Sequence, residues 1–166
     1  MELVEARKQF VAAWGSFGSN WGINRTMAQI HALLMVTTKP LAADEIMQEL
    51  TISRGNANMN IRELINWGLV ERVVVSGERR EFFAAEKDIW KVARIIVRER
   101  KKRELEPMMR FLESISAVEG AEADVATFEK TISDIRRFGQ QADQAMETML
   151  KADENWLLGT LLKLMR

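Results

Sequence analysis

Residues 51–85 read TISRGNANMNIRELINWGLVERVVVSGERREFFAA, in which a polar helix pattern is followed at once by a hairpin pattern. Ser53 is a favourable N-cap, and Gly68 can end the helix because glycine adopts the left-handed conformation without strain. The apolar residues between them recur at helical spacing, at Ala57, Ile61, Leu64 and Ile65. The sequence therefore predicts a helix that begins after Ser53 and turns one apolar face inward.

A hairpin is predicted directly after this helix, with strands at residues 70–75 and 80–84. The loop between them contains Gly77, which accepts positive φ. On the amino side, residues 41–50 (LAADEIMQEL) predict another helix, because acidic side chains occupy its first turn and its apolar side chains form one stripe. Helix, tight turn, helix and hairpin in this order predict a winged helix-turn-helix, an architecture that reads DNA.

Two further helices are predicted before this unit. Residues 2–18 place their apolar side chains along one side and run into a stretch rich in glycine and serine. Asn24 is a favourable N-cap for the next helix, which Lys39 and Pro40 end.

After the hairpin, the chain is predicted to be helical from residue 88 almost to its end, with a break near residues 119–120 and an apolar segment at residues 156–165. Such long arms have little core of their own to cover, so we expect a homodimer formed through the N- and C-terminal helices. The helix after the break spaces its apolar residues by four and three, the pattern of a seam that packs against another helix: Phe128, Ile132, Ile135, Gly139, Ala142, Met146 and Met149.

These elements predict a mainly α fold with a small β-hairpin. Residues 1–87 are assigned to a winged helix-turn-helix DNA-binding domain that includes the N-terminal helices. Residues 88–166 are assigned to long helical dimerisation arms.

Composition restricts the chemistry of this chain. Its 166 residues include no cysteine and one histidine, which excludes disulfides and zinc-thiolate sites and leaves little for metal binding. The sequence lacks a nucleophile–base pairing and a phosphate loop, so we expect no enzyme, no cofactor and no metal. No apolar run approaches the roughly 18 residues of a membrane span, and the amino terminus is amphipathic, so a cytoplasmic protein with no membrane partner is expected.

Charge is unevenly distributed along a chain whose net charge is zero. Residues 53–110 carry 14 basic and 9 acidic side chains, whereas residues 111–166 carry 6 basic and 10 acidic ones. The positive surplus falls on the predicted helix, the hairpin and the helix that follows, where attraction to phosphate would be useful. A charged stretch is often only a solvated face, so this pattern supports the motif without establishing it.

The exposed face of the helix after Ser53 is the predicted reading surface. Asparagine pairs bidentately with adenine and arginine with guanine in the major groove. Gly55 would let the backbone come close to phosphate, and the first-turn amides add a phosphate site. The alternative is a surface helix with solvated asparagines, but asparagine is a poor helix former and three occur at alternate positions. The residues assigned to DNA on this helix are Ser53, Arg54, Gly55, Asn56, Asn58, Asn60 and Arg62.

Arg79 and Arg80 at the hairpin tip are assigned to the minor groove or to phosphate, with Glu78 orienting one of them. The alternative is a pair of exposed charges, and Arg79 is the stronger candidate. Residues 98–107 (RERKKRELEP) form either a phosphate-facing patch or a solvated helix face, because glutamates are interleaved with the basic residues.

The stretch SRGNANMNIRELINWGLVERVVVSGERREFF, residues 53–83, resembles the winged helix-turn-helix of the GbsR branch of MarR-like bacterial transcriptional regulators. The resemblance covers residues 10–110 and implies a dimeric regulator, usually a repressor, that binds a double-stranded DNA operator and responds to a small-molecule effector. The alternative function is a protein-interaction adaptor that retains the fold without reading DNA. The residues that carry the resemblance are Ser53, Gly55, Asn56, Arg62, Leu64, the Trp67-Gly68-Leu69-Val70 boundary and Gly77-Glu78-Arg79.

Four aromatic residues near the amino terminus raise the question of an effector site. Members of this branch that regulate osmoprotectants are thought to recognise choline or betaine-like cations, and an aromatic cage suits a quaternary ammonium group. Aromatics at helical spacing also serve as core or dimer contacts, which is the alternative. His31 is expected to be a satisfied packing residue rather than a sensor. The four candidates for the cage are Phe10, Trp14, Phe17 and Trp21.

Overall fold

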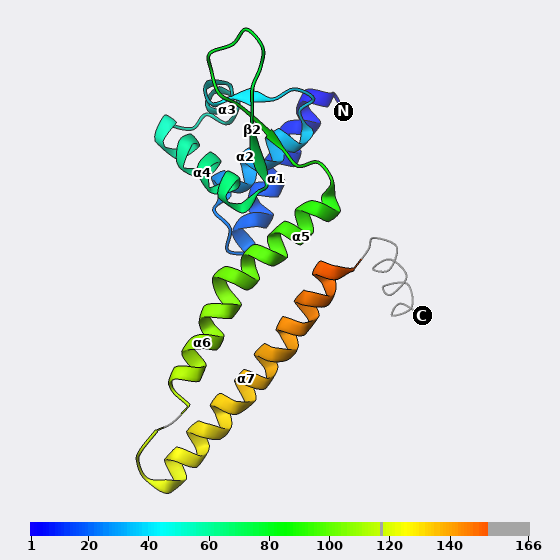
Figure 1. The fold of residues 1–166 in the computed structure, drawn as a ribbon. Helices are drawn as coiled ribbons and strands as arrows, with labels where there is room; N and C mark the ends of the chain where they lie inside the picture. Colours follow the sequence, from blue (N-terminus) through cyan, green and yellow to red (C-terminus); the bar gives the residue numbers. More distant parts are fainter. Residues whose placement is uncertain (117, 153–166) are drawn as a thin grey trace. The chain divides into compact units, whose positions relative to one another are not determined.

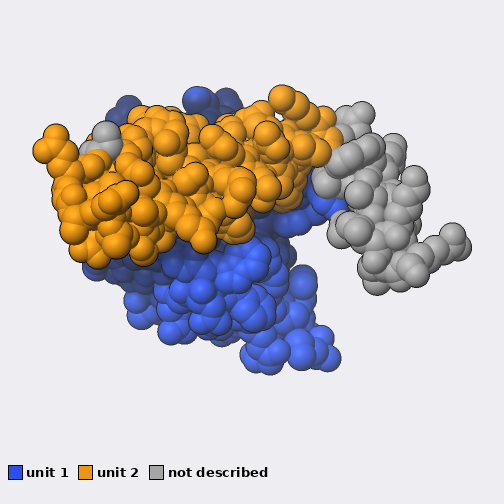
Figure 2. Space-filling model, turned by 90° about the horizontal axis from the view of Figure 1, so that it is seen from below, with its two compact units in different colours: residues 1–92 blue, residues 93–166 orange. Residues whose placement is uncertain are grey.

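The structure is a computed structural model that describes residues 1–116 and 118–152 (Figure 1). It contains two compact units, residues 1–92 and 93–166, which are coloured separately in Figure 2. Most described residues are helical, and one three-stranded antiparallel sheet completes the fold. The predicted mainly α fold with a small β-hairpin is therefore confirmed. Among the described residues, no helix combines the length and the hydropathy needed to cross a membrane.

Helix α2 (Arg25–Val36) lies at the centre of the first unit. The Asn24 side chain accepts a hydrogen bond from the Met27 N–H at 3.1 Å, which confirms the predicted N-cap. The buried face of α2 packs against helix α1 (Leu3–Asn20) and against the helices and strand that follow in the chain. Because seven of the ten α2 residues from Met27 onward are buried, this helix supports the other elements of the unit.

The helix-turn-helix consists of α3 (Ala43–Leu50) and α4 (Arg54–Trp67). The sequence predicted that the first helix starts at Leu41, and this start is wrong, because Leu41–Ala42 instead form the short strand β1. The Glu45 carboxylate accepts the Ala42 N–H at 2.6 Å and so caps α3 two residues later than predicted. Thr51 then adopts a φ of 53°, which reverses the chain into α4.

The sheet has the strand order β1-β3-β2, with β2 at Val70–Val73 and β3 at Phe82–Ala85. Both pairings are antiparallel, and Val73 of β2 lies opposite Phe82 of β3. The strands that flank the loop are shorter than predicted towards their tip, because Val74 is 97% exposed and pairing ends where the valines leave the core. The loop projects from the sheet in Figure 1, and its turn places Gly77 at a φ of 84°. This hairpin is the wing.

The helical region after the wing begins with α5 (Ile89–Arg100), within which the boundary of the two units falls. It continues through the π-helical turn η1 (Lys101–Leu105) into α6 (Glu106–Ser114). Pro107 has no N–H that could donate to the carbonyl oxygen of Arg103 one turn earlier. The loss of this α-helical hydrogen bond explains the local π-helical geometry. The predicted break follows, and α7 (Glu122–Lys151) returns antiparallel to η1 and α6 (Figure 1).

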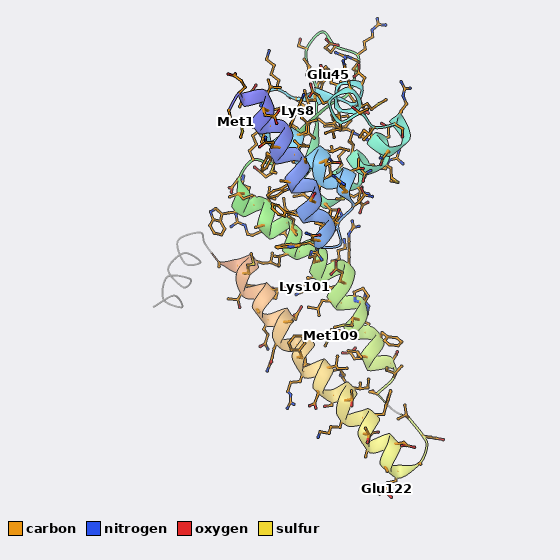
Figure 3. All side chains as sticks on the ribbon, turned by 180° about the vertical axis from the view of Figure 1, so that it is seen from behind. Met1, Lys8, Glu45, Lys101, Met109 and Glu122 are labelled. Carbon is orange, nitrogen blue, oxygen red and sulfur yellow. The ribbon has the colours of Figure 1, made fainter. Side chains whose placement is uncertain are left out.

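Close packing joins α6 and α7 at Gly139, where an added Cβ would overlap the sulfur of Met109. The Lys101 ammonium is paired with Asp143 at 3.0 Å and with Glu147, and these bonds fix η1 to α7. Figure 3 labels Lys101, Met109 and Glu122 on this hairpin of helices.

The predicted seam of α7 is only partly covered in the single chain. Ile132 and Gly139 are buried, whereas Phe128 and Ile135 remain 37% and 40% exposed. The apolar segment at residues 156–165 lies outside the described residues.

Candidate nucleic-acid interface

Helix α4 exposes one face along most of its length. The Ser53 hydroxyl accepts the Asn56 N–H at 3.3 Å, as expected of the N-cap, and Ala57, Ile61 and Leu64 are buried. Arg54, Asn58 and Arg62 follow one another at intervals of four residues, so their side chains lie in one row. The exposed residues of this face are Arg54, Gly55, Asn58, Met59 and Arg62.

Asn60 does not lie on this face, and its predicted exposure is wrong. The residue is 3% exposed, and its amide nitrogen donates to the backbone oxygen of Asn56 at 2.8 Å and to the Asn56 Oδ1 at 2.7 Å. Residues two apart on an α-helix are rotated by roughly 200°, so three asparagines at alternate positions cannot share one face. Asn56 and Asn60 lie on one side of α4 and Asn58 on the other.

Asn56 is only half-buried, but its side chain is also engaged within the protein. Its Nδ2 donates to the hydroxyl of Thr26 on α2 at 3.3 Å. The sequence does not predict the involvement of Thr26, because its contact with Asn56 spans 30 residues and has no local pattern.

The two arginines of the wing are in different environments. Arg80 bonds the Asp44 carboxylate at 3.0 Å and Glu78 at 3.4 Å, and its guanidinium lies 5.2 Å from the centre of the Phe82 ring. Its hydrogen bonds to Asp44 and then Glu78 raise the pKa of Arg80 above the ordinary arginine value. Arg79 is exposed and makes no hydrogen bond or ion pair with any described residue. Arg79 is thus the cation of the wing that is available to a ligand.

Asp44 was not predicted as part of this surface, since it lies 36 residues before Arg80 in the sequence. The orienting role expected of Glu78 corresponds to its ion pair with Arg80.

Two of the basic residues at 98–107 are paired with interleaved glutamates, and a third, Lys101, is paired with Asp143 and Glu147 of α7. Arg100 bonds Glu104 at 3.1 Å, and Arg103 bonds Glu99 at 2.9 Å, both one helical turn apart. Because three of the five basic side chains in this segment are already paired, the geometry favours the solvated helix face over a patch that is free to bind phosphate.

The four aromatic residues assigned to an effector cage follow one face of α1 and its C-cap. The rings of Phe10 and Trp14 lie 5.5 Å apart with an interplanar angle of 35°. Phe17 and Trp21 are 62% and 71% exposed. The structure therefore brings the first two rings together and leaves the last two largely open to solvent.

His31 is buried in α2, as the packing assignment predicted, but its hydrogen bonding is not satisfied. Its Nε2 has no partner among the described residues, and burial lowers its pKa from 6.5 to about 4. The imidazole is therefore neutral at physiological pH. Within the described ranges, no three metal-ligating side chains come together.

Comparisons with known proteins agree with this geometry. A model of the MarR family matches residues 21–81, from the end of α1 to the wing. The HTH-type transcriptional regulator MmpR5 of Mycobacterium tuberculosis is 29% identical over 76 residues, which are 45% of this chain and 46% of that protein. The match thus spans about half the length of this curated relative.

A crystal structure of a transcriptional regulator superposes with a TM-score of 0.66 and covers 87% of this chain and 95% of its own, at 19% sequence identity. This similarity shows a shared fold. The matching family model describes the MarR family and not one of its branches, so the resemblance to the GbsR branch stays a prediction. Across α2, α3, α4 and the first part of the wing the chain is thus similar to the MarR family, and it has a winged helix-turn-helix fold.

Proposed function

We propose that this protein is a sequence-specific DNA-binding transcriptional regulator of the GbsR type, which inserts the exposed face of α4 into the major groove. The observation that carries the proposal is the exposed row of Arg54, Asn58 and Arg62 on a helix whose opposite face is buried. Guanidinium and amide groups are the side chains that make bidentate contacts with guanine and adenine. Gly55 and the first-turn amides after Ser53 suit the adjacent phosphates.

The wing supplies a second contact through Arg79. An exposed arginine at the tip of a hairpin can neutralise phosphate or enter a narrow minor groove. Arg80 has a smaller role in this proposal, because two carboxylates already neutralise its charge.

The functional unit is proposed to be a homodimer formed through the N- and C-terminal helices. A second copy would cover exposed apolar side chains of α1 and α7, among them Phe17 and Phe138, which are 62% and 70% exposed. Two-fold symmetry presents two α4 helices to successive major grooves about 34 Å apart.

Occupancy of a promoter by such a dimer obstructs transcription, so the proposed regulatory outcome is repression in the cytoplasm, with no catalysis. A small-molecule effector releases the DNA only if it binds the released conformation more tightly than the DNA-bound one. The aromatic residues of α1 are the proposed effector contacts.

The proposal is tested by selecting duplexes from a random library with the full-length protein and then measuring the salt dependence of binding. We expect enrichment of a two-fold symmetric sequence. Arg54→Ala should weaken binding to the enriched duplex, whereas Arg79→Ala should weaken all duplexes and reduce the salt slope by about one. Absence of binding to every duplex at low ionic strength would overturn the proposal and favour the protein-interaction adaptor.

A further inference from the structure

A chain of hydrogen bonds connects the start of α4 to the start of α2. Asn60 Nδ2 donates to the backbone oxygen and to Oδ1 of Asn56, at 2.8 and 2.7 Å, and Asn56 Nδ2 donates to Thr26 Oγ1 at 3.3 Å. Thr26 follows the N-cap of α2 by two residues, and that cap is itself closed by a hydrogen bond to Met27. This series of hydrogen bonds therefore ends in the first turn of α2, which its own N-cap holds in place.

The chemistry of these groups determines the orientation of each amide. A backbone oxygen can only accept, so the Asn60 atom beside it must be the nitrogen. The same nitrogen contacts the Asn56 side chain, so the Asn56 atom on that side must be the oxygen. The other end of the Asn56 amide, which faces Thr26, is then the nitrogen.

This orientation affects which asparagine can read a base. An asparagine that recognises adenine uses its amide oxygen and its amide nitrogen together. Both ends of the Asn56 amide are already bonded within the protein, and its backbone N–H and oxygen are bonded to Ser53 and Asn60. Asn58 is exposed, and none of the hydrogen bonds seen among the described residues involves its side chain.

Building on the proposed DNA-reading function, we propose that Thr26 and Asn60 are positioning residues that fix Asn56 and the first turn of α4, and that Asn58 reads an adenine. Asn60 is almost completely buried, so loss of its partners would leave a polar group unsatisfied. The network thus has one stable arrangement. It holds the backbone of α4 at the depth and rotation that aim Asn58 and its neighbours at the base edges.

Thr26 offers the cleanest test, because it lies on α2 and its side chain can be replaced almost isosterically. Thr26→Val removes the hydroxyl and keeps the shape, whereas Thr26→Ser keeps the hydroxyl and serves as the matched control. The measurement is the ratio of affinities of the full-length protein for its selected duplex and for a scrambled duplex, well below the unfolding temperature. The salt slope and a repeated selection are measured for each variant.

We expect Thr26→Val to lower this ratio about fivefold, spread over several base positions, with unchanged salt slope and unchanged affinity for the scrambled duplex. Thr26→Ser should have the same affinity ratio as the wild-type protein. Asn58→Ala should abolish the preference for adenine at one position of each half-site, at a cost of about tenfold in affinity.

An unchanged ratio in Thr26→Val would overturn the inference, and so would loss of a single adenine preference in Asn56→Ala with Asn58→Ala unaffected. Neither result affects the proposed function, because the wild-type protein would still select a duplex. A wild-type protein that selects no duplex would overturn the proposed function and this inference together.

Discussion

Individual charges on the proposed DNA surface differ mainly in whether a neighbouring side chain already pairs with them. Arg80 bonds two carboxylates and lies against Phe82, whereas Arg79, next to it in sequence, bonds no described residue. A formal charge count of the wing therefore overstates the charge that is available to phosphate. The pairing with Arg80 predicts that Asp44 affects the proposed DNA affinity without contacting DNA.

Asp44→Asn should strengthen binding to a nonspecific duplex, because it removes one carboxylate that bonds Arg80 and leaves the guanidinium freer to contact phosphate. The salt slope should become steeper, by up to about one. Fluorescence anisotropy over a range of salt concentrations provides the measurement. Glu49→Gln, at an exposed position of the same helix, removes the same charge without touching Arg80 and is the control. Equal gains in both variants would contradict the pairing argument.

His31 should make the stability of the first unit depend on pH. Its pKa is about 4 in the folded protein and 6.5 as a free side chain, so the unfolded chain binds more protons between these values. The free energy of unfolding should be highest above pH 6.5 and fall by up to about 3 kcal/mol as the pH drops to 4. Urea unfolding at several pH values measures this loss.

His31→Leu separates this effect from carboxylates that titrate in the same range. The variant has no imidazole, so its stability should change less than that of the wild type between pH 6.5 and 4. Parallel pH profiles for the two proteins would show that His31 does not carry the dependence.

At the level of secondary-structure elements, the sequence predicts those helix ends that depend only on neighbouring residues. The caps at Asn24 and Ser53 and the end of α4 at Gly68 follow from the hydrogen-bonding and conformational preferences of single residues. Strand β1 could not be predicted, because two residues form a strand only through pairing with β3, which lies about 40 residues later.

The sequence likewise predicts the part of the candidate site that depends on local pattern, and not the part that depends on tertiary contacts. Arg54, Asn58 and Arg62 lie on the predicted exposed face, because the apolar face of α4 defines its opposite. The prediction that Asn60 shares the exposed face with Asn58 is wrong, because alternate positions on an α-helix point to opposite sides. The contacts of Thr26 and Asp44 depend on tertiary packing across 30 and 36 residues, for which the sequence has no local pattern.

Helices α6 and α7 approach each other closely at Gly139. Gly139→Leu should destabilise the helical arm by about 1 to 3 kcal/mol, because Met109 already occupies the space beside Gly139. Thermal unfolding followed by circular dichroism would detect the loss. Gln140→Leu adds the same side chain at the next, exposed position and should change stability little. Equal unfolding temperatures for Gly139→Leu and the wild type would show that the two helices do not pack closely at this glycine.

At the scale of the whole molecule, α1 carries a row of apolar side chains that the single chain leaves largely uncovered. Leu3, Phe10, Trp14, Phe17 and Trp21 recur at the spacing of the core positions of a coiled coil, yet Leu3, Phe17 and Trp21 are more than 60% exposed in the single chain. An exposed seam of this regularity is typical of a helix that packs against another copy. The aromatic residues would then contribute to the dimer contact whether or not they also contact an effector.

Phe17→Asp should therefore weaken the proposed dimer on the order of a hundredfold, because a symmetric interface loses two buried phenylalanines and gains two charges. Sedimentation equilibrium measures the change in mass, and Ser16→Asp, exposed beside the seam, is the matched control. A monomer presents a single α4. The Phe17→Asp variant should therefore bind a duplex with two half-sites no more tightly than a duplex with one. The Ser16→Asp variant should still bind the duplex with two half-sites more tightly. If Phe17→Asp keeps the mass and the DNA affinity of the wild type, α1 does not form the interface, and the two reading helices must be related by contacts elsewhere in the chain.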